Sequence, residues 1–314
     1  MDTGYRALRE GAAWLDLSSR GRLRVTGEDR ARWLHAMVSN HVEQLQPGRG
    51  CYAFLLNAQG RILGDLSLLC FEGFFLLDTE PETRLSSLEH LNRHIIADDV
   101  TLEDVTGETT EVGVEGPESV GVLRALGAPV PEAEYSHAPW GTRVVARLST
   151  TGAPGFALIA PRYEHAGLVL QLESAGAVAA GPETARTVRI ELGHPRYGED
   201  LTDKHLPQET QLLHALNFNK GCYLGQEIVE RIRSRGGVHR FLVRLAIETQ
   251  EPPPPGAKIT AGGKAVGEIT SAVYSPAAGR VMALGYVRLG DFPANAPLEA
   301  AGSRAEIAPP ARGQ

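Results

Sequence analysis

Strand-like and helix-like patterns follow one another along most of the chain. Residues 22–25 alternate polar and apolar side chains and predict a strand, and apolar positions between residues 33 and 38 predict the buried stripe of a helix. Thr26 and Asp29, three residues apart ahead of this stripe, predict a capping box at the start of the helix. The segment therefore reads as a strand, a tight glycine turn and a helix.

A second segment repeats this pattern. Residues 112–114 predict a strand, Gly116 and Pro117 a turn, and apolar positions between residues 120 and 126 a helix face. The strings VTGED and VEGPE mark corresponding places in the two segments. The sequence thus predicts an internal duplication of a strand–turn–helix half.

Hairpins and further helices lie between and after these segments. Residues 51–78 alternate apolar runs with the turns NAQG and EG, and a helix is predicted after them, with Pro81 near its start and Thr79 as its cap. Further expected elements are a strand near 100–105, a hairpin of 143–148 and 155–159, and a helix at 164–172. This mixture favours an α+β fold over a doubly wound sheet.

A change of composition precedes the C-terminal domain. Four prolines at 252–255 exclude a helix or a central strand, and short predicted strands after them are typical of a small β-barrel. Because residues 241–247 already read as a strand, we expect the barrel and its tail to occupy 241–314. The rest of the chain is predicted to form α+β domains from 1–50 and 109–240, which carry the duplicated halves. Residues 51–108 are expected to be a hairpin-plus-helix insertion that completes the N-terminal half.

Composition narrows the class of protein. The chain has 31 basic and 38 acidic side chains and a net charge of −7, which argues against direct binding of nucleic acid. Cys51, Cys70 and Cys222 are odd in number and far apart, and the histidines lack a metal-binding spacing, so neither a disulfide framework nor a metal site is predicted. No segment approaches the roughly 20 apolar residues of a membrane span, and no signal-peptide core is present. We expect a cytoplasmic protein without a membrane partner.

The string KGCYLGQE carries the most chemistry in the chain. Cys222 lies two residues after Lys220, at the predicted start of a helix whose apolar stripe is Leu224, Ile228 and Ile232. Helix-end N–H groups and the ammonium of Lys220 both favour the thiolate, so Cys222 is a candidate catalytic residue with Lys220 as its tuning partner. The alternative is that Cys222 is a small buried side chain without chemistry.

KGCYLGQE resembles the signature of the YgfZ family, folate-binding proteins related to the aminomethyltransferase (T-protein) of the glycine cleavage system. The likeness extends over nearly the whole chain, through LRVTGEDRARWLHAMVSNHV, RTVRIELGHPRYGEDL and GEITSAVYSPAAGRVMALGYV. It implies a three-domain, cloverleaf arrangement around a central folate cavity, with tetrahydrofolate or a derivative as the cofactor. Within the motif, Tyr223 and Gln226 are counted among the predicted folate-binding residues.

Two carboxylates are candidates for contact with that folate. A pterin edge presents an N–H and an amino group side by side, which suits the two acceptors of a carboxylate, and the resemblance places Glu191 there. An ordinary surface glutamate is the alternative. In T-proteins the hairpin that corresponds to NAQGRILGD resembles GGILDD; here Gly64 replaces the first acid and only Asp65 remains. Because neighbouring strand positions face opposite sides, Asp65 is open either to this role or to a solvent-facing one.

A basic segment follows the motif. The carboxylates of a folate glutamyl tail could meet Arg231, Arg233, Arg235 or Arg240, since guanidinium groups suit that geometry. The alternative is a solvated helix face on which Glu227 and Arg231 form an i, i+4 pair.

The resemblance implies a folate-binding accessory protein that acts through Cys222 in the assembly or repair of iron–sulfur clusters. Its expected partners are folate and, transiently, iron–sulfur client or assembly proteins, with an indirect effect on cluster-dependent enzymes of tRNA modification. The alternative is an enzyme, a tetrahydrofolate-dependent aminomethyltransferase or related one-carbon transferase. A third hypothesis, a hydrolase or acyltransferase with Cys222 as nucleophile, would need a histidine such as His239 beside the thiol.

Overall fold

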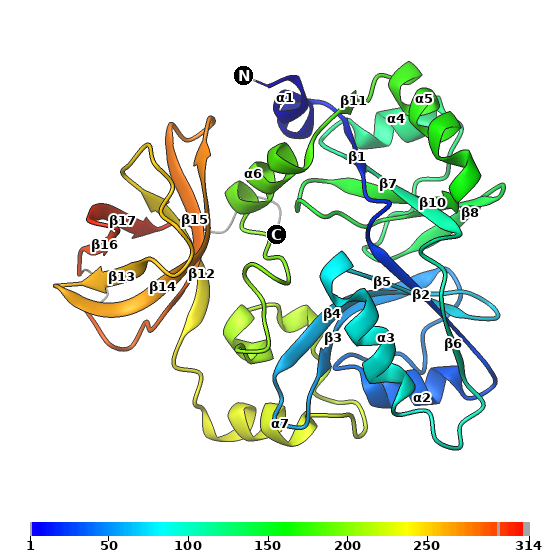
Figure 1. The fold of residues 1–314 in the computed structure, drawn as a ribbon, viewed down its shortest axis with the longest axis horizontal. Coiled ribbons are helices and arrows are strands. Elements are labelled where there is room, and N and C mark those ends of the chain that lie inside the picture. Colours follow the sequence, from blue (N-terminus) through cyan, green and yellow to red (C-terminus); the bar gives the residue numbers. More distant parts are fainter. Residues whose placement is uncertain (1, 294–295, 310–314) are drawn as a thin grey trace.

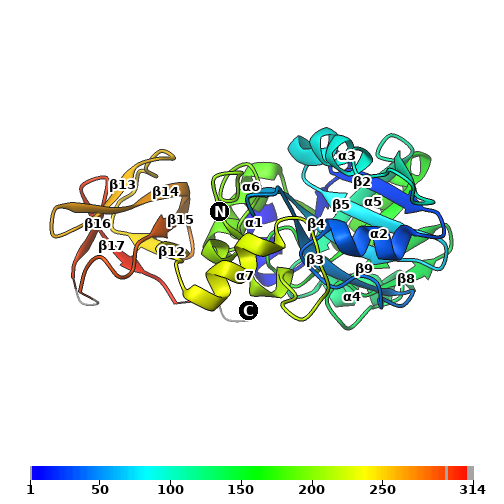
Figure 2. The ribbon, with the colours of Figure 1, turned by 90° about the horizontal axis from the view of Figure 1, so that it is seen from below.

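The chain folds into a body of two sheets and a separate β-barrel (Figure 1). This structure is a computed structural model, and it describes residues 2–293 and 296–309. Figure 2 shows the barrel at one end of an elongated molecule and both sheets at the other. The predicted α+β fold with a C-terminal barrel is confirmed.

The sheet that we call the N-terminal sheet has the strand order β3-β4-β5-β2-β6. Side chains alternate between its faces, so Leu66, Leu68 and Leu77 share one apolar face with a buried core. The opposite face is turned toward the second sheet (Figure 1) and carries Leu69 and Leu76 as well as polar side chains such as Ser67 and Asp78. The strands are β2 (Gly21–Thr26), β3 (Arg49–Leu56), β4 (Ile62–Cys70), β5 (Phe75–Thr79) and β6 (Thr101–Asp104).

Two helices cover the apolar face of this sheet. They are α2 (Arg30–Met37) and α3 (Arg84–Asn92), which contribute Trp33, Leu34 and Leu91 to the core; a short 3-10 turn, η1 (Pro81–Thr83), precedes α3.

The second sheet, here the central sheet, has the order β11-β1-β7-β10-β9-β8. Helices α4 (Ser119–Ala125) and α5 (His165–Ser174) pack Leu123 and Leu168 against Val112 and Phe156 of its strands, and α1 (Thr3–Glu10) lies over its other end. The strands are β1 (Ala13–Asp16), β7 (Thr109–Glu115), β8 (His137–Trp140), β9 (Arg143–Ala146), β10 (Gly155–Pro161) and β11 (Val178–Ala179), and η2 (Arg162–Glu164) leads into α5.

The barrel closes in the order β12-β15-β14-β13-β16-β17 around an apolar interior. Its strands are β12 (Phe241–Ile247), β13 (Lys258–Ala261), β14 (Lys264–Ser275), β15 (Arg280–Val287), β16 (Leu298–Ala300) and β17 (Ser303–Ile307). Between the body and the barrel lie α6 (Pro182–Leu192), η3 (Pro207–Thr210), η4 (Leu213–Ala215) and α7 (Gln226–Arg235).

A buried carboxylate joins the barrel to the body. Asp200 is fully buried and accepts hydrogen bonds from Thr270 and Ser271 of β14, at 2.5 and 2.7 Å. Its other oxygen accepts from the guanidinium of Arg189 on α6, at 2.5 Å, and from the backbone N–H of Arg196. This carboxylate therefore fixes the segment after α6 against the barrel, because its charge is satisfied only while both sides remain in place.

Both predicted strand–turn–helix segments form, as β2–α2 and β7–α4, and their turn glycines share an uncommon conformation. Gly27 and Gly116 have φ of 106° and 120°. A Cβ at Gly27 would lie 2.0 Å from the carbonyl oxygen of Asp99, and one at Gly116 would lie 2.4 Å from that of Gly11. Only glycine fits either position.

Three expectations about helix ends and faces are wrong. The first turn of α2 has no capping box, because Asp29 is itself the N-cap residue and its side chain accepts from the N–H of Asp99 instead. Thr79 ends β5 and donates to the carbonyl of Asp65 rather than capping α3. On α7 the fully buried residue is Val229, which lies outside the predicted stripe.

Candidate functional site

The polar face of the N-terminal sheet brings together side chains from distant parts of the chain. Tyr52 of β3 is opposite Ser67 of β4, and Ser67 is opposite Asp78 of β5. One further step along the same β4–β5 register places Asp65 opposite Glu80, the residue after β5. Strand alternation therefore gathers one aromatic and three acidic side chains on a single face.

Asp65 has the most unusual environment on this face. The hydroxyl of Tyr52 donates to Oδ2 at 2.7 Å, while Oδ1 is buried and has no hydrogen-bond partner within the described residues. Burial, and then the charge of Glu80, raise the pKa of Asp65 to about 6. The carboxyl group can therefore gain or lose a proton near neutral pH, with one oxygen free to meet a ligand.

The neighbouring position, Gly64, faces away from this group. A Cβ built on Gly64 would approach Ser87 and Thr83, on the side of α3 and η1. Asp65, and not position 64, therefore points to the polar face.

Aromatic rings flank the carboxyl group. The ring of Tyr135 stacks on that of Tyr52, with centroids 6.3 Å apart, and the exposed ring of His214 is 5.5 Å from Tyr52 on another side. Asn40 fixes this arrangement, because its amide donates to the carbonyls of both Tyr52 and His214 at 2.8 Å. Flat rings beside a carboxylate suit a planar ligand with N–H groups on its edge.

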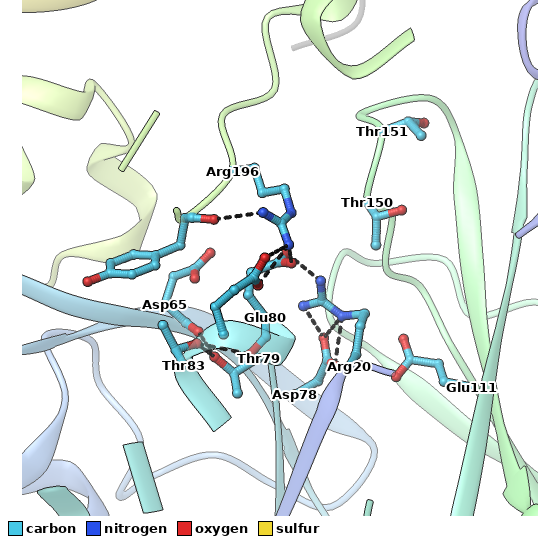
Figure 3. Close-up of polar contacts among 12 residues, drawn as sticks. Arg20, Asp65, Asp78, Thr79, Glu80, Thr83, Glu111, Thr150, Thr151 and Arg196 are labelled. Atoms are coloured by element: carbon cyan, nitrogen blue, oxygen red, sulfur yellow. Dashed lines mark hydrogen bonds and ion pairs between the residues drawn. The ribbon is translucent and has the colours of Figure 1, made fainter. Parts of the chain in front are cut away.

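Two arginines close the other side of the group (Figure 3). Arg20 binds Asp78 through three hydrogen bonds of 2.7–3.0 Å and donates to Glu80 at 2.5 Å. Arg196 contacts Glu80 at 2.9 Å and the more exposed Glu82 at 2.7 Å. Both guanidinium groups are thus paired with carboxylates of the chain, and neither is free for an acidic ligand.

Glu191, the predicted pterin ligand, lies elsewhere, on α6 where the barrel meets the N-terminal helix. Its Oε1 accepts from the hydroxyls of Tyr5 and Ser275 at 2.6 and 2.5 Å, and Arg9 lies 3.8 Å from Oε2. In the described part of the chain Oε2 has no hydrogen-bond partner. One carboxylate oxygen is therefore already used inside the protein, so the two-acceptor contact expected from the sequence is not available without displacing these hydroxyls.

Within KGCYLGQE, the ammonium of Lys220 was expected to lie near the Cys222 thiol, but it binds backbone carbonyls instead. Its ammonium donates to the carbonyls of His35, Val38 and Asn40, at 2.5, 2.6 and 2.7 Å, and lies over the ring of Tyr223. These carbonyls favour the charged form, whereas burial lowers the pKa of Lys220 to about 7. Lys220 thus anchors the end of α2 to this loop.

Tyr223 and Gly225 of the motif are also closely packed, whereas the thiol of Cys222 is exposed. Tyr223 is 7 % exposed, and a Cβ at Gly225 would lie 2.6 Å from the carbonyl oxygen of Asn57 in the β3–β4 hairpin. Gln226 accepts from the N–H of Tyr223. Cys222 is exposed and precedes α7 by four residues, so it does not lie at the helix start as expected. Tyr223 and Gln226 serve this packing, and within the described residues neither forms a hydrogen bond with Asp65.

The predicted basic residues lie on α7 and in the segment between α7 and β12. Arg233 pairs with Glu230 at 3.6 Å and lies over the ring of Phe218, and Arg240 binds Glu209 at 2.9 Å. Arg231 is exposed and makes no ion pair with any described residue. Of Arg231, Arg233 and Arg240, Arg231 is therefore the one without a carboxylate partner among the described residues.

The sequence analysis did not predict Tyr52, Tyr135, His214, Glu80 or Arg20 as members of this group. The strings DLS and LDTE contain a usable signal for the polar face, because their acids alternate with leucines that belong to the core. Between residues 2 and 293 and from 296 to 309, no group of three or more His, Cys, Asp or Glu residues is arranged to hold a metal ion. No helix of that part is long and apolar enough to cross a membrane.

Fold and site together define a two-sheet α+β body with a C-terminal barrel and an acidic, aromatic site on one sheet face. Two family profiles match the chain, the GCVT N-terminal domain over residues 1–220 and the glycine cleavage T-protein C-terminal barrel domain over residues 240–312. The chain therefore belongs to the GCVT, or glycine cleavage T-protein, family.

Individual relatives agree with this assignment. An aminomethyltransferase of Streptomyces coelicolor is 31 % identical over 297 residues, which cover 90 % of this chain and 79 % of the relative. A putative chloroplastic transferase of Arabidopsis thaliana is 29 % identical, over 91 % of this chain and 68 % of its own. The crystal structure of the glycine cleavage system aminomethyltransferase T from Bartonella henselae superposes with a TM-score of 0.89 at 22 % identity, covering 98 % of this chain and 87 % of that one, and shows the same fold.

Proposed function

We propose that the protein binds tetrahydrofolate beside Asp65 and transfers a one-carbon group to this tetrahydrofolate. This is the aminomethyltransferase function that the sequence analysis gave as the alternative. The observation that carries this proposal is the Asp65 carboxyl group, whose buried Oδ1 has no partner within the described chain. Relatives that are named aminomethyltransferases support the same reaction class.

The residues present fit the pterin part of such a ligand. The unpartnered Oδ1 of Asp65 offers an acceptor for an N–H of the pterin edge, and the rings of Tyr52 and Tyr135 offer a stacking surface. Arg231 is the candidate for the glutamyl tail. When bound, tetrahydrofolate would supply the nitrogen that receives the one-carbon group. Asp65 would then hold or accept a proton at Oδ1 while Tyr52 fixes Oδ2.

Calorimetric titration of tetrahydrofolate tests this binding site. We expect saturable binding by the wild type and about fivefold weaker binding by Tyr135→Ala, since a lost stacking ring costs roughly 1 kcal/mol. Tyr163→Ala is the matched control, because that ring is 80 % exposed and lies at η2. Absence of binding by the wild type would refute the proposal.

A second candidate function is favoured by Cys222. Its neighbours in KGCYLGQE are held by packing, whereas this thiol is exposed. A fixed loop that presents one thiol supports the YgfZ-type role, in which folate binding accompanies transient contact with iron–sulfur client or assembly proteins and, indirectly, tRNA modification. The three free thiols, at Cys51, Cys70 and Cys222, accord with a reducing cytoplasmic location.

Cys222→Ser separates the two candidates. If the accessory role holds, this variant keeps its affinity for tetrahydrofolate but fails to support cluster-dependent enzymes in cells that lack the wild-type protein. Cys70→Ser is the control, because Cys70 is buried in the core and its thiol donates to the carbonyl of Leu45. Full complementation by Cys222→Ser would remove the thiol from the function.

A further inference from the structure

Glu80 is the closest acidic neighbour of Asp65 that strand pairing provides. The last paired residues of β4 and β5 are Ser67 and Asp78, and the same register continued by one step sets Glu80 across from Asp65. Hydroxyls lock this turn, because Thr79 donates to the carbonyl of Asp65 at 2.8 Å and Thr83 donates to that of Glu80 at 3.1 Å. Like charges placed opposite each other on neighbouring strands repel.

Glu80 is the member of this pair that the structure keeps ionised. Arg20 and Arg196 contact its two carboxylate oxygens, at 2.5 and 2.9 Å. Burial raises the pKa of Glu80, but the two guanidinium groups outweigh burial and hold it below its usual value. Asp65 has no such cation, since its one side-chain partner is the neutral hydroxyl of Tyr52.

The remaining groups around Asp65 do not compensate this charge. From the other packed elements it is faced by the phenols of Tyr52, Tyr135 and Tyr197, whose pKa values burial raises, so all three are neutral at pH 7. Arg20, whose charge favours the ionised form of Asp65, is shared with Asp78. His194, which faces Glu80, has a pKa that burial lowers to about 4, so it is neutral as well.

We propose that Glu80 is a positioning residue for Asp65: fixed across the strand pair and kept ionised by Arg20 and Arg196, it makes the Asp65 carboxylate hold a proton more tightly, so that this group can take a proton from a bound ligand at Oδ1. That a ligand binds at Oδ1 rests on the proposed function, whereas the effect of Glu80 on Asp65 does not. The charges of Glu80, Arg20 and Arg196 therefore set the acid strength of the Asp65 carboxyl group, and none of these three side chains needs to touch the ligand.

Titration of the Asp65 carboxyl carbon by ¹³C NMR tests the proposal in the protein without ligand. The Asp65 signal is assigned by its loss in Asp65→Asn. We expect its midpoint to fall by about one pH unit in Glu80→Gln, the effect of removing one nearby like charge. Glu80→Asp, which keeps the charge, should retain the wild-type midpoint. Glu82→Gln is the matched control, because Glu82 also binds Arg196 but is half-exposed and lies in η1.

A second variant, with a shift of the Asp65 midpoint in the opposite direction, tests the proposal if Glu80→Gln does not fold. In Arg196→Gln, Arg20 still keeps Glu80 ionised, but the negative charge of Glu80 is less compensated, so the Asp65 midpoint should rise. An unchanged midpoint in either folded variant would overturn the proposal. The pH dependence of tetrahydrofolate affinity should shift with the NMR midpoint. If the wild type binds no tetrahydrofolate, the proposed function fails, while the NMR midpoints still decide the role of Glu80.

Discussion

Asp65→Asn should lower the rate of one-carbon transfer to tetrahydrofolate by about 10²–10⁴-fold, the usual contribution of a positioned acid–base group. The amide has the shape of the carboxyl group and can still accept from the hydroxyl of Tyr52, so the local hydrogen bond at Oδ2 is preserved. It cannot take up or release a proton in the neutral range. The loss should therefore appear in the rate of transfer and much less in thermal stability.

The measurement is the formation of one-carbon-loaded tetrahydrofolate from an aminomethyl donor, followed by mass spectrometry for both proteins. Asp291→Asn is the control, because it makes the same chemical change at an exposed residue after the last long barrel strand. Transfer by Asp65→Asn at the wild-type rate would exclude Asp65 from the chemistry. Wild-type protein that binds tetrahydrofolate but transfers nothing would favour the accessory role of Cys222 instead.

The pH dependence follows from the same carboxyl group. If transfer needs the carboxylate, activity should rise with pH around a midpoint near 6, because burial and Glu80 raise the pKa of Asp65 to about 6. The effect on stability has the opposite sign. The folded protein holds this proton more tightly than the unfolded chain, whose carboxyl has a pKa near 3.8, so Asp65 makes folding less favourable as pH rises from about 4 to about 6.

The sequence predicted the elements of the fold far better than the site. Alternation at 22–25 and 112–114, and the proline run between β12 and β13 of the barrel, reflect local rules that the structure follows. The interpretation of the sequence placed no helix around Glu191, yet residues 182–192 form α6. Glycine at 193, with φ of 74°, is the stop signal that this interpretation overlooked.

The site depends on contacts that no local pattern records. Asp65 meets Glu80 through strand register, and Arg196 reaches Glu80 from a segment more than one hundred residues later. The reading of Lys220 failed for a related reason. Proximity in sequence to Cys222 predicted a charge partner, but an ammonium has three N–H donors, and the end of α2 offers three carbonyls in a buried place.

Lys220→Met should lower the free energy of unfolding by about 3–5 kcal/mol, because it leaves three buried carbonyls without a donor at the end of α2. Methionine has nearly the same length, so the loss of packing is small. In a protein of this size the melting temperature should fall by roughly 5–10 °C. Lys204→Met is the matched control, since the Lys204 side chain is exposed.

The same variant decides between the two roles of Lys220. If Lys220 anchors the loop, its loss frees residues 220–225, and Cys222 should react with a thiol reagent at least as fast as in the wild type. If instead its charge stabilises the Cys222 thiolate, Lys220→Met should slow that reaction at neutral pH and leave the melting temperature nearly unchanged. Three carbonyls within 2.7 Å of the ammonium favour the first result. KGCYLGQE would then be a motif in which the lysine, the tyrosine and the second glycine build a rigid support for one exposed thiol.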